Sequence, residues 1–295
     1  MKKLLKKPPL PFRGNKGKWF NEIKDIISKI EANDITVVDV FGGSGLISYW
    51  IKNIRPEWTV IYNDFDNYEL RLNNIDKTEL LRLKILEILT KNNDNNHNKA
   101  LKDETTNEIK ELIKTMNDNQ EYIDIQTLTS WICFSGRRLE NIDALLKEPH
   151  LYSRTPKEAI NKEIYKDYLK DINIVRFDAS DYESFINNLN LVDITKTLFI
   201  LDPPYLYTET SGYSSNIARE WFDLKASVGL FRYFVNEHSL IFFSSDKSGL
   251  LETFNLNCSI FNKDSLIIKP DEIIYKKTPS GCCNYKMNEY LIYRI

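Results

Sequence analysis

The sequence predicts an α/β fold in which a mainly parallel sheet is interrupted by a helical insertion. Most of its apolar runs lack apolar–polar alternation, as expected for strands that are covered on both faces. Between residues 67 and 170 the apolar pattern becomes helical, over a stretch far longer than an ordinary crossover connection. The predicted strands of the central sheet are Ile35–Phe41, Thr59–Asp64, Ile172–Asp178, Thr197–Asp202 and Ser239–Ser245.

Residues 67–170, called the helical block below, carry apolar side chains at helical spacing. Residues 68–91 are rich in Leu and Ile, and a second helical face runs from Ile109 to Met116. Thr155-Pro156-Lys157-Glu158 has the pattern of a capping box, which predicts the start of another helix. The block is therefore expected to be an all-helical unit.

This block divides the chain into two expected domains. We expect residues 1–66 and 171–295 to form one domain, with residues 67–170 inserted into it as a subdomain. Three apolar segments near the C-terminus are expected to add strands at one edge of the sheet. They are Leu266–Lys269, Ile273–Tyr275 and Asn288–Ile295.

The composition excludes several classes of protein. The chain has 295 residues and is 42% apolar, which is enough for a substantial core. No apolar run approaches the roughly 20 residues of a membrane helix, and the basic N-terminus has no apolar stretch typical of a signal peptide. The four cysteines form no CxxC pair and the three histidines stand apart, so we expect no metal site and no disulfide framework. A cytoplasmic protein with reduced thiols fits these features.

Positive charge is concentrated at the N-terminus. The whole chain has a formal net charge of -2, yet residues 1–18 contain seven Lys or Arg and no acid. A local basic patch can bind phosphates on a protein that is neutral overall, because the local field decides. A solvated tail is the simpler explanation of the same charges, and both interpretations stay open at this point.

A glycine-rich turn follows the first predicted strand. In Asp39-Val40-Phe41-Gly42-Gly43-Ser44-Gly45 the glycines let the backbone approach a ligand, and the next helix begins there. The turn is not GxGxxG and no Lys-Ser/Thr follows, which argues against a P-loop NTPase. Asp64 ends the second strand, where an acid suits the two hydroxyls of a ribose. Together these features predict a nucleoside-containing cofactor, although each has an ordinary structural explanation.

A stiff acidic corner follows the fourth predicted strand. In Asp202-Pro203-Pro204-Tyr205 the two prolines fix φ and remove two backbone donors. The Asp202 carboxylate and the Pro203 carbonyl can then accept hydrogen bonds from one amine, beside the aromatic face of Tyr205. Such a corner suits a flat ring that carries an amino group.

These motifs resemble those of the DNA N6-adenine methyltransferases of the α-group, the Dam-like or D12 class. The glycine turn looks like their F-x-G-x-G loop, residues 202–205 look like their DPPY box, and the loop precedes the box as in that group. Weaker matches to the N-terminal, second and closing motifs lie in Pro11–Lys16, Asn63–Leu70 and Asn288–Ile292. The resemblance implies a Rossmann-like S-adenosylmethionine methyltransferase sheet with an inserted helical subdomain, and S-adenosyl-L-methionine as the cofactor.

The resemblance also implies roles for particular residues. Asp202, Pro203 and Tyr205 would be catalytic, with the first two holding the protons of adenine N6 and Tyr205 stacking on a base flipped from the duplex. No metal is needed for this transfer. The implied cofactor contacts are Phe12 and Lys16 at the methionine end, Asp39, Phe41 and Gly43 along the loop, Asp64 at the ribose, Asp181 near the adenine with Asp178 as a competitor, and Asp202.

The helical block is the expected reader of the DNA sequence. Arg137 and Arg138 lie in a Gly-containing turn, Ser135–Arg138, and together with Arg154 they can reach guanine edges or phosphates. The alternative is a helix start with solvated arginines. The block lacks the Arg-x-Asn hairpin segment associated with GATC-reading members, which puts a GATC target in doubt.

Several alternative functions stay open at the sequence level. The same corner could methylate cytosine N4, an RNA adenine or a glutamine amide, and Asp at position 202 favours adenine over these. A non-catalytic DNA- or cofactor-binding relative is a further alternative. The expected partner is double-stranded DNA, while the recognition sequence and any partner restriction endonuclease are left open.

Overall fold

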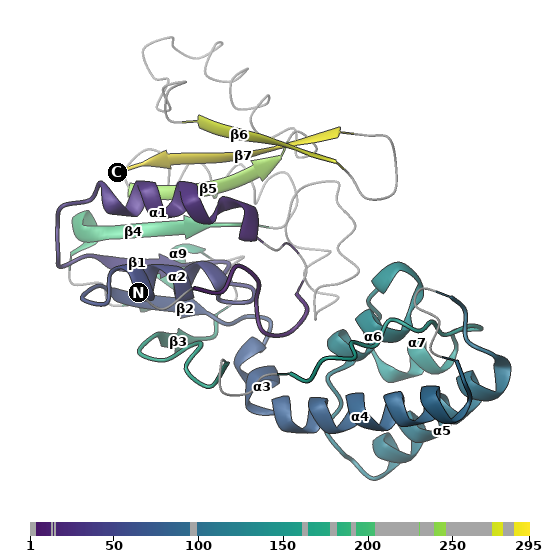
Figure 1. Ribbon diagram of the computed structural model, residues 1–295. Helices are drawn as coiled ribbons and strands as arrows, with labels where there is room; N and C mark the ends of the chain where they lie inside the picture. The colour runs from purple at the N-terminus through teal and green to yellow at the C-terminus, as the bar shows by residue number, and fades with distance from the viewer. Residues whose placement is uncertain are drawn as a thin grey trace.

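The computed structural model describes residues 4–12, 14, 16–94, 99–160, 165–177, 182–189, 193–203, 230, 239–245, 273–279 and 286–295. Within them the chain forms a Rossmann-like sheet of seven strands, in the order β3-β2-β1-β4-β5-β7-β6 (Figure 1). The first five in this order are parallel, while β7 runs antiparallel to β5 and β6. This confirms the predicted α/β class. The strands are β1 Thr36–Asp39, β2 Thr59–Asn63, β3 Asn173–Val175, β4 Thr197–Leu201, β5 Ser239–Ser245, β6 Ile273–Pro279 and β7 Lys286–Arg294.

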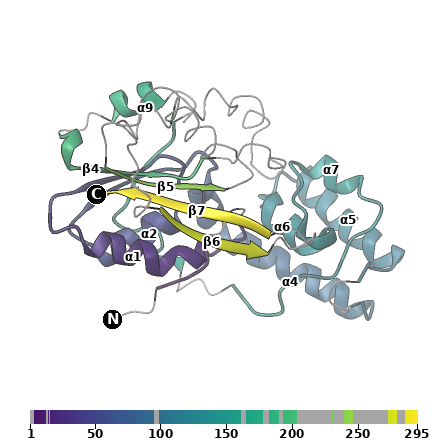
Figure 2. The same ribbon diagram turned by 90° about the horizontal axis from the view of Figure 1, so that it is seen from above.

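Both faces of the parallel sheet are covered. Helices α1, Phe20–Ser28, and α2, Leu46–Ile54, lie on one face, and α9, Tyr182–Asn188, lies on the other (Figure 2). Neighbouring residues of one strand therefore enter different cores, because side chains alternate across a strand. Val37 packs into the core under α1 and α2, whereas Val38 packs into the core under α9. Because helices cover both faces of the sheet, the strands appear in the sequence as continuous apolar runs.

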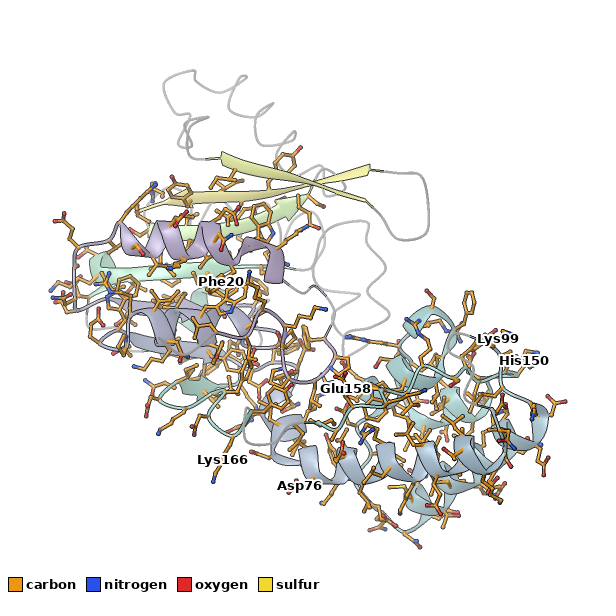
Figure 3. All side chains as sticks on the ribbon, in the orientation of Figure 1. Phe20, Asp76, Lys99, His150, Glu158 and Lys166 are labelled. Atoms are coloured by element: carbon orange, nitrogen blue, oxygen red, sulfur yellow. The ribbon has the colours of Figure 1, made fainter. Side chains whose placement is uncertain are left out.

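The helices that follow β2 form a group beyond the sheet. They are α3 Tyr68–Asn73, α4 Ile75–Lys91, α5 Asp103–Asp118, α6 Ile125–Ile132 and α7 Ile142–Leu146. Helices α4 to α7 share a core of their own, which includes Ile85, Ile113 and Trp131. Figure 1 shows this group joined to the sheet side through α3, and Figure 3 shows Lys99 and His150 at its remote end.

Some predicted elements differ from the observed ones. The helix expected over residues 68–91 is two helices, α3 and α4, which meet at Asn74. The capping box predicted from Thr155 is wrong, because the described residues from 155 to 160 form no helix. The buried Arg82 guanidinium donates to the carbonyls of Pro156 and Lys157 at 2.8 and 3.2 Å, and this tertiary contact holds the segment instead. Residues 266–269 lie outside the described residues.

Candidate functional site

The predicted cofactor loop and the acidic corner meet at one edge of the sheet. Strands β1 and β4 are parallel neighbours in which Asp39 is paired with Ile200, and the Val40 amide donates to the Ile200 carbonyl at 3.1 Å. The glycine turn that follows β1 and the Asp202-Pro203 segment that follows β4 therefore leave the sheet side by side. This is the edge at which parallel α/β sheets bind ligands.

Lys16 joins the N-terminal segment to this edge. Its ammonium lies 2.6 Å from Asp202 Oδ2, donates to the Gly14 carbonyl at 3.3 Å, and lies 5.3 Å from the centre of the Phe243 ring. Burial raises the pKa of Asp202, and the ammonium offsets part of that rise. A strong, charge-assisted hydrogen bond thus holds the carboxylate that the sequence predicts as the amine acceptor.

Asp39 is buried at the end of β1, with 1% of its surface exposed. Its Oδ2 accepts from the Ser48 hydroxyl at 2.7 Å, while Oδ1 has no hydrogen-bond partner within the described part of the chain. Burial raises the pKa of Asp39 to about 7, against the lowering effect of Ser48. The free oxygen can accept a hydrogen bond from a cationic or amino group brought to this edge.

Two glycines of the turn are required by the rings that pack on them. A Cβ at Gly42 would lie 2.1 Å from the Tyr62 ring, and one at Gly43 would lie 2.8 Å from the Phe12 ring. Gly43 also has φ +52°, and its carbonyl accepts from the Tyr62 hydroxyl at 2.7 Å. Phe12 and Tyr62 therefore both pack against the glycine turn, and sequence reasoning missed Tyr62.

Asp64 is fully buried and caps α3. Its Oδ1 accepts from the Tyr62 hydroxyl at 2.9 Å and the Tyr68 amide at 2.6 Å. Its Oδ2 accepts from the Glu69 amide at 3.1 Å and the Arg176 guanidinium at 3.2 Å. Burial raises its pKa, and these hydrogen bonds act in the other direction. A ribose at this carboxylate would compete with four protein donors, of which the Arg176 guanidinium belongs to a half-exposed side chain.

The remaining residues predicted to be catalytic or to bind the cofactor fall into two groups. Phe41 is half-buried against the core under α9, and Pro203 is buried. Tyr205 and Asp181 lie outside the described residues.

The three predicted DNA-contacting arginines gather around one turn of the helical block. Ser135 and Gly136 both have positive φ, 52° and 69°, in a short 3-10 turn between α6 and α7. A Cβ at Gly136 would lie 3.3 Å from Arg154 Nη1, so Arg154 borders this turn. Arg137 has a half-exposed side chain that pairs with Glu148, while Arg138 is more buried. The arrangement can present positive charge to a phosphate if the Glu148 pair opens.

No group of three metal-binding side chains occurs within the described ranges. None of the described helices is both long and apolar enough to cross a membrane. A cavity of about 600 Å³ lies elsewhere, between α3, the start of α4 and residues 165–170, and none of the predicted site residues lines it.

The chain is similar in sequence to known methyltransferases. The model of the D12 class N6 adenine-specific DNA methyltransferase family matches residues 12–236. A Haemophilus influenzae protein named "Putative methyltransferase" is 34% identical over 261 residues, covering 86% of this chain and 81% of that protein. Among solved structures, the human methyltransferase 10 domain containing protein has a TM-score of 0.36 at 9% identity, over 96% of this chain and 84% of the other.

Proposed function

The chain belongs to the D12 class N6 adenine-specific DNA methyltransferase family, and from this premise we propose that it methylates adenine N6 in double-stranded DNA. The observation that carries the proposal is the meeting of Lys16, Asp39 and Asp202 at the carboxyl edge of β1 and β4. Lys16 and Asp202 are 186 positions apart in the sequence, yet their charged atoms lie 2.6 Å apart.

The residues at this edge fit S-adenosyl-L-methionine. Asp39 has a buried carboxylate oxygen without a described partner, which is suited to an ammonium group. Phe12 and Lys16 would border the methionine end, Phe41 and Gly43 would line the cofactor, and Asp64, Asp181 and Asp202 would complete its site. When bound, this cofactor supplies an electrophilic methyl group on a sulfonium.

Asp202 and Pro203 prepare the amine that accepts the methyl group. The N6 lone pair of adenine is delocalised into the ring, which makes it a poor nucleophile. Hydrogen bonds from both N6 protons to the Asp202 carboxylate and the Pro203 carbonyl favour a localised lone pair. Because Lys16 holds the carboxylate before the reaction, the acceptor is preorganised. Tyr205 would stack on the base after it has left the duplex.

The helical block supplies the second half of the proposal. We infer that residues 67–170 form the target-recognition subdomain of a catalytic domain made of residues 1–66 and 171–295. Arg137, Arg138 and Arg154 would contact the duplex around the Gly136 turn. The separate core of α4 to α7 supports this division, because it lets the block be a folded unit beside the sheet.

Analysis of nucleosides after methylation tests the proposal. Purified protein is incubated with S-adenosylmethionine and mixed-sequence duplex DNA, and the digested product is expected to contain N6-methyladenine. Asp202→Ala should slow the reaction by about 10²–10³-fold, because one preorganised polar contact typically contributes that much. N4-methylcytosine as the product, or methylation of RNA alone, would overturn the adenine assignment. Failure to bind S-adenosylmethionine in calorimetry would favour a non-catalytic relative.

A further inference from the structure

Helix α3 holds the N-terminal segment through two side chains. The Tyr68 hydroxyl accepts from the Leu10 amide at 2.8 Å and donates to the Leu10 carbonyl at 2.9 Å. Its ring meets Phe12 edge-on, with the ring centres 5.7 Å apart. One turn further along α3, Arg71 Nη2 donates to the Pro11 carbonyl at 2.8 Å. Residues three apart share a helix face, so α3 holds the segment that leads to Lys16 from one side.

The same arginine reaches the helical block. Arg71 Nε lies 3.1 and 3.0 Å from the two carboxylate oxygens of Asp124, and Nη2 lies 3.0 Å from the Thr127 hydroxyl. Nη1 lies 3.4 Å from the side-chain oxygen of Gln126. Asp124 in turn caps α6 by accepting from the Thr127 amide at 3.1 Å. Arg71 and Asp124 are only 6% and 4% exposed, so this is a buried ion pair between two parts of the chain.

The N-terminus of α3 completes the connection to the cofactor edge. Its first two amides, those of Tyr68 and Glu69, donate to the Asp64 carboxylate. One short helix therefore contacts Asp64, the segment that carries Phe12 and Lys16, and the start of α6.

We propose that Arg71 is a positioning residue that couples the helical block to the cofactor site. Its guanidinium donates hydrogen bonds to both the Pro11 carbonyl and the Asp124 carboxylate, so one group holds the N-terminal segment and the start of α6. A shift of α6 when the block engages duplex DNA then changes the placement of Phe12 and Lys16, and with it the affinity for cofactor. The structural link stands on the observed contacts, whereas its effect on DNA and cofactor rests on the proposed function. Such coupling is reciprocal.

Hydrogen exchange of the full-length protein tests the link without any ligand. In Arg71→Leu, amides of residues 4–19 and of residues 124–133 are both expected to exchange faster. Arg82→Leu is the matched control, because Arg82 is equally buried but pairs with Glu79 inside the helical block. It should leave residues 4–19 unchanged. Faster exchange in residues 124–133 alone, or the same loosening of residues 4–19 in both variants, would overturn the link.

Two further variants keep this test decisive if Arg71→Leu does not fold. Arg71→Lys keeps the charge but lacks the planar fork that serves Pro11 and Asp124 together, so both segments should loosen to a smaller extent. Tyr68→Phe removes only the hydroxyl that holds Leu10, so only residues 4–19 should loosen. Wild-type exchange in both variants would reject the arrangement.

Calorimetry with S-adenosylhomocysteine, the form of the cofactor that has lost its methyl group and cannot react with the DNA, tests the coupling. In the wild type, mixed-sequence duplex DNA is expected to change the cofactor dissociation constant by about tenfold, the usual size of such couplings. Arg71→Lys should reduce this change, and Arg82→Leu should keep it. No effect of DNA in the wild type, or an unaltered effect in Arg71→Lys, contradicts the coupling. Absence of any cofactor binding by the wild type contradicts the proposed function instead, and the exchange result still decides the link.

Discussion

The pair formed by Lys16 and Asp202 influences the charge of the candidate catalytic aspartate. Burial raises the pKa of Asp202, and the nearby ammonium lowers it. An ionised carboxylate accepts hydrogen bonds from both the lysine and the substrate amine, whereas a protonated one is a poorer acceptor. Lys16 therefore has an electrostatic role in addition to any contact with the cofactor.

Replacing Lys16 should move the pH profile of the reaction. Lys16→Met removes the charge that lowers the pKa of Asp202, so the carboxyl group stays protonated to a higher pH. The acidic limb of kcat/KM is expected to shift to higher pH, measured as methyl transfer to duplex DNA across the acidic range. Lys24→Met, at an exposed position of α1, is the control and should leave the limb in place. An unshifted limb in Lys16→Met would show that Lys16 does not tune Asp202.

Asp39 should make stability depend on pH. Its pKa is raised from 3.8 to about 7, so its protonated form is stabilising below the unfolded value and that contribution is lost as pH rises through 7. Asp39→Asn is neutral at every pH and should gain about 3 kcal/mol of relative stability between pH 5 and pH 8, because about two pH units of the shift lie in this window. Urea unfolding of both proteins at the two pH values measures the difference. Equal differences at pH 5 and pH 8 would contradict this role of Asp39.

At the scale of elements, the turn between β1 and α2 determines how the N-terminal segment meets the sheet. Gly43 has a positive φ and lies against the Phe12 ring, so its missing side chain serves both backbone and packing. The sequence predicts this turn from three glycines in four residues. It does not reveal Tyr62 or Phe12 as the packing partners, because these come from other elements.

Comparison of Gly43→Ala with Gly14→Ala should separate the effect of the positive φ from the effect of the contact with Phe12. Gly43→Ala is expected to lower the free energy of unfolding by about 1–2 kcal/mol from the positive φ alone. It should also weaken cofactor binding, because the new Cβ would lie 2.8 Å from the Phe12 ring. Gly14→Ala is the matched control, since Gly14 has φ +81° but its Cβ would lie 3.9 Å from the nearest atom, Lys16 Nζ. Similar losses of cofactor affinity in both variants would leave Phe12 without a special role.

The observed bounds of the helices and strands show where tertiary contacts override the structure that the local sequence pattern predicts. The apolar run Ser239–Ser245 matches β5, since a strand buried on both faces is evident from composition alone. The capping pattern at Thr155 predicts a helix that does not form there. The Arg82 guanidinium donates hydrogen bonds to the backbone carbonyls of Pro156 and Lys157, and this tertiary contact overrides the local helix signal.

At the scale of the whole molecule, the sheet edge and the arginine turn belong to different folded parts. Figure 1 shows α6 and α7 beyond α3, away from the sheet. A duplex bound by the proposed enzyme must contact the helical block while one base leaves the stack and reaches Asp202. In this layout the helical block would contact phosphates or base edges, and the sheet edge would carry out the chemistry.

Charge removal at the arginine turn tests this layout. Arg137→Ala should weaken binding to mixed-sequence duplex DNA by roughly fivefold and reduce the salt slope by about one, if Arg137 contacts a phosphate. Glu148→Gln should not weaken binding, because it releases Arg137 from its ion pair. Lys24→Ala, at an exposed position of α1, is the control, and fluorescence anisotropy at several salt concentrations measures all three. Unchanged affinity and unchanged site preference in Arg137→Ala would reject the assignment.

The sequence by itself determines the fold class, the helical interruption and the two motifs that meet at the sheet edge. These are local properties: strand burial appears as continuous apolar runs, and turn chemistry appears as Gly and Pro at particular positions. Only the tertiary structure places Lys16 on Asp202, surrounds Asp64 with four donors and makes Arg71 the joint between two parts of the chain. Such contacts depend on strand order and helix docking, which bring distant residues together without leaving a periodic signal in the chain.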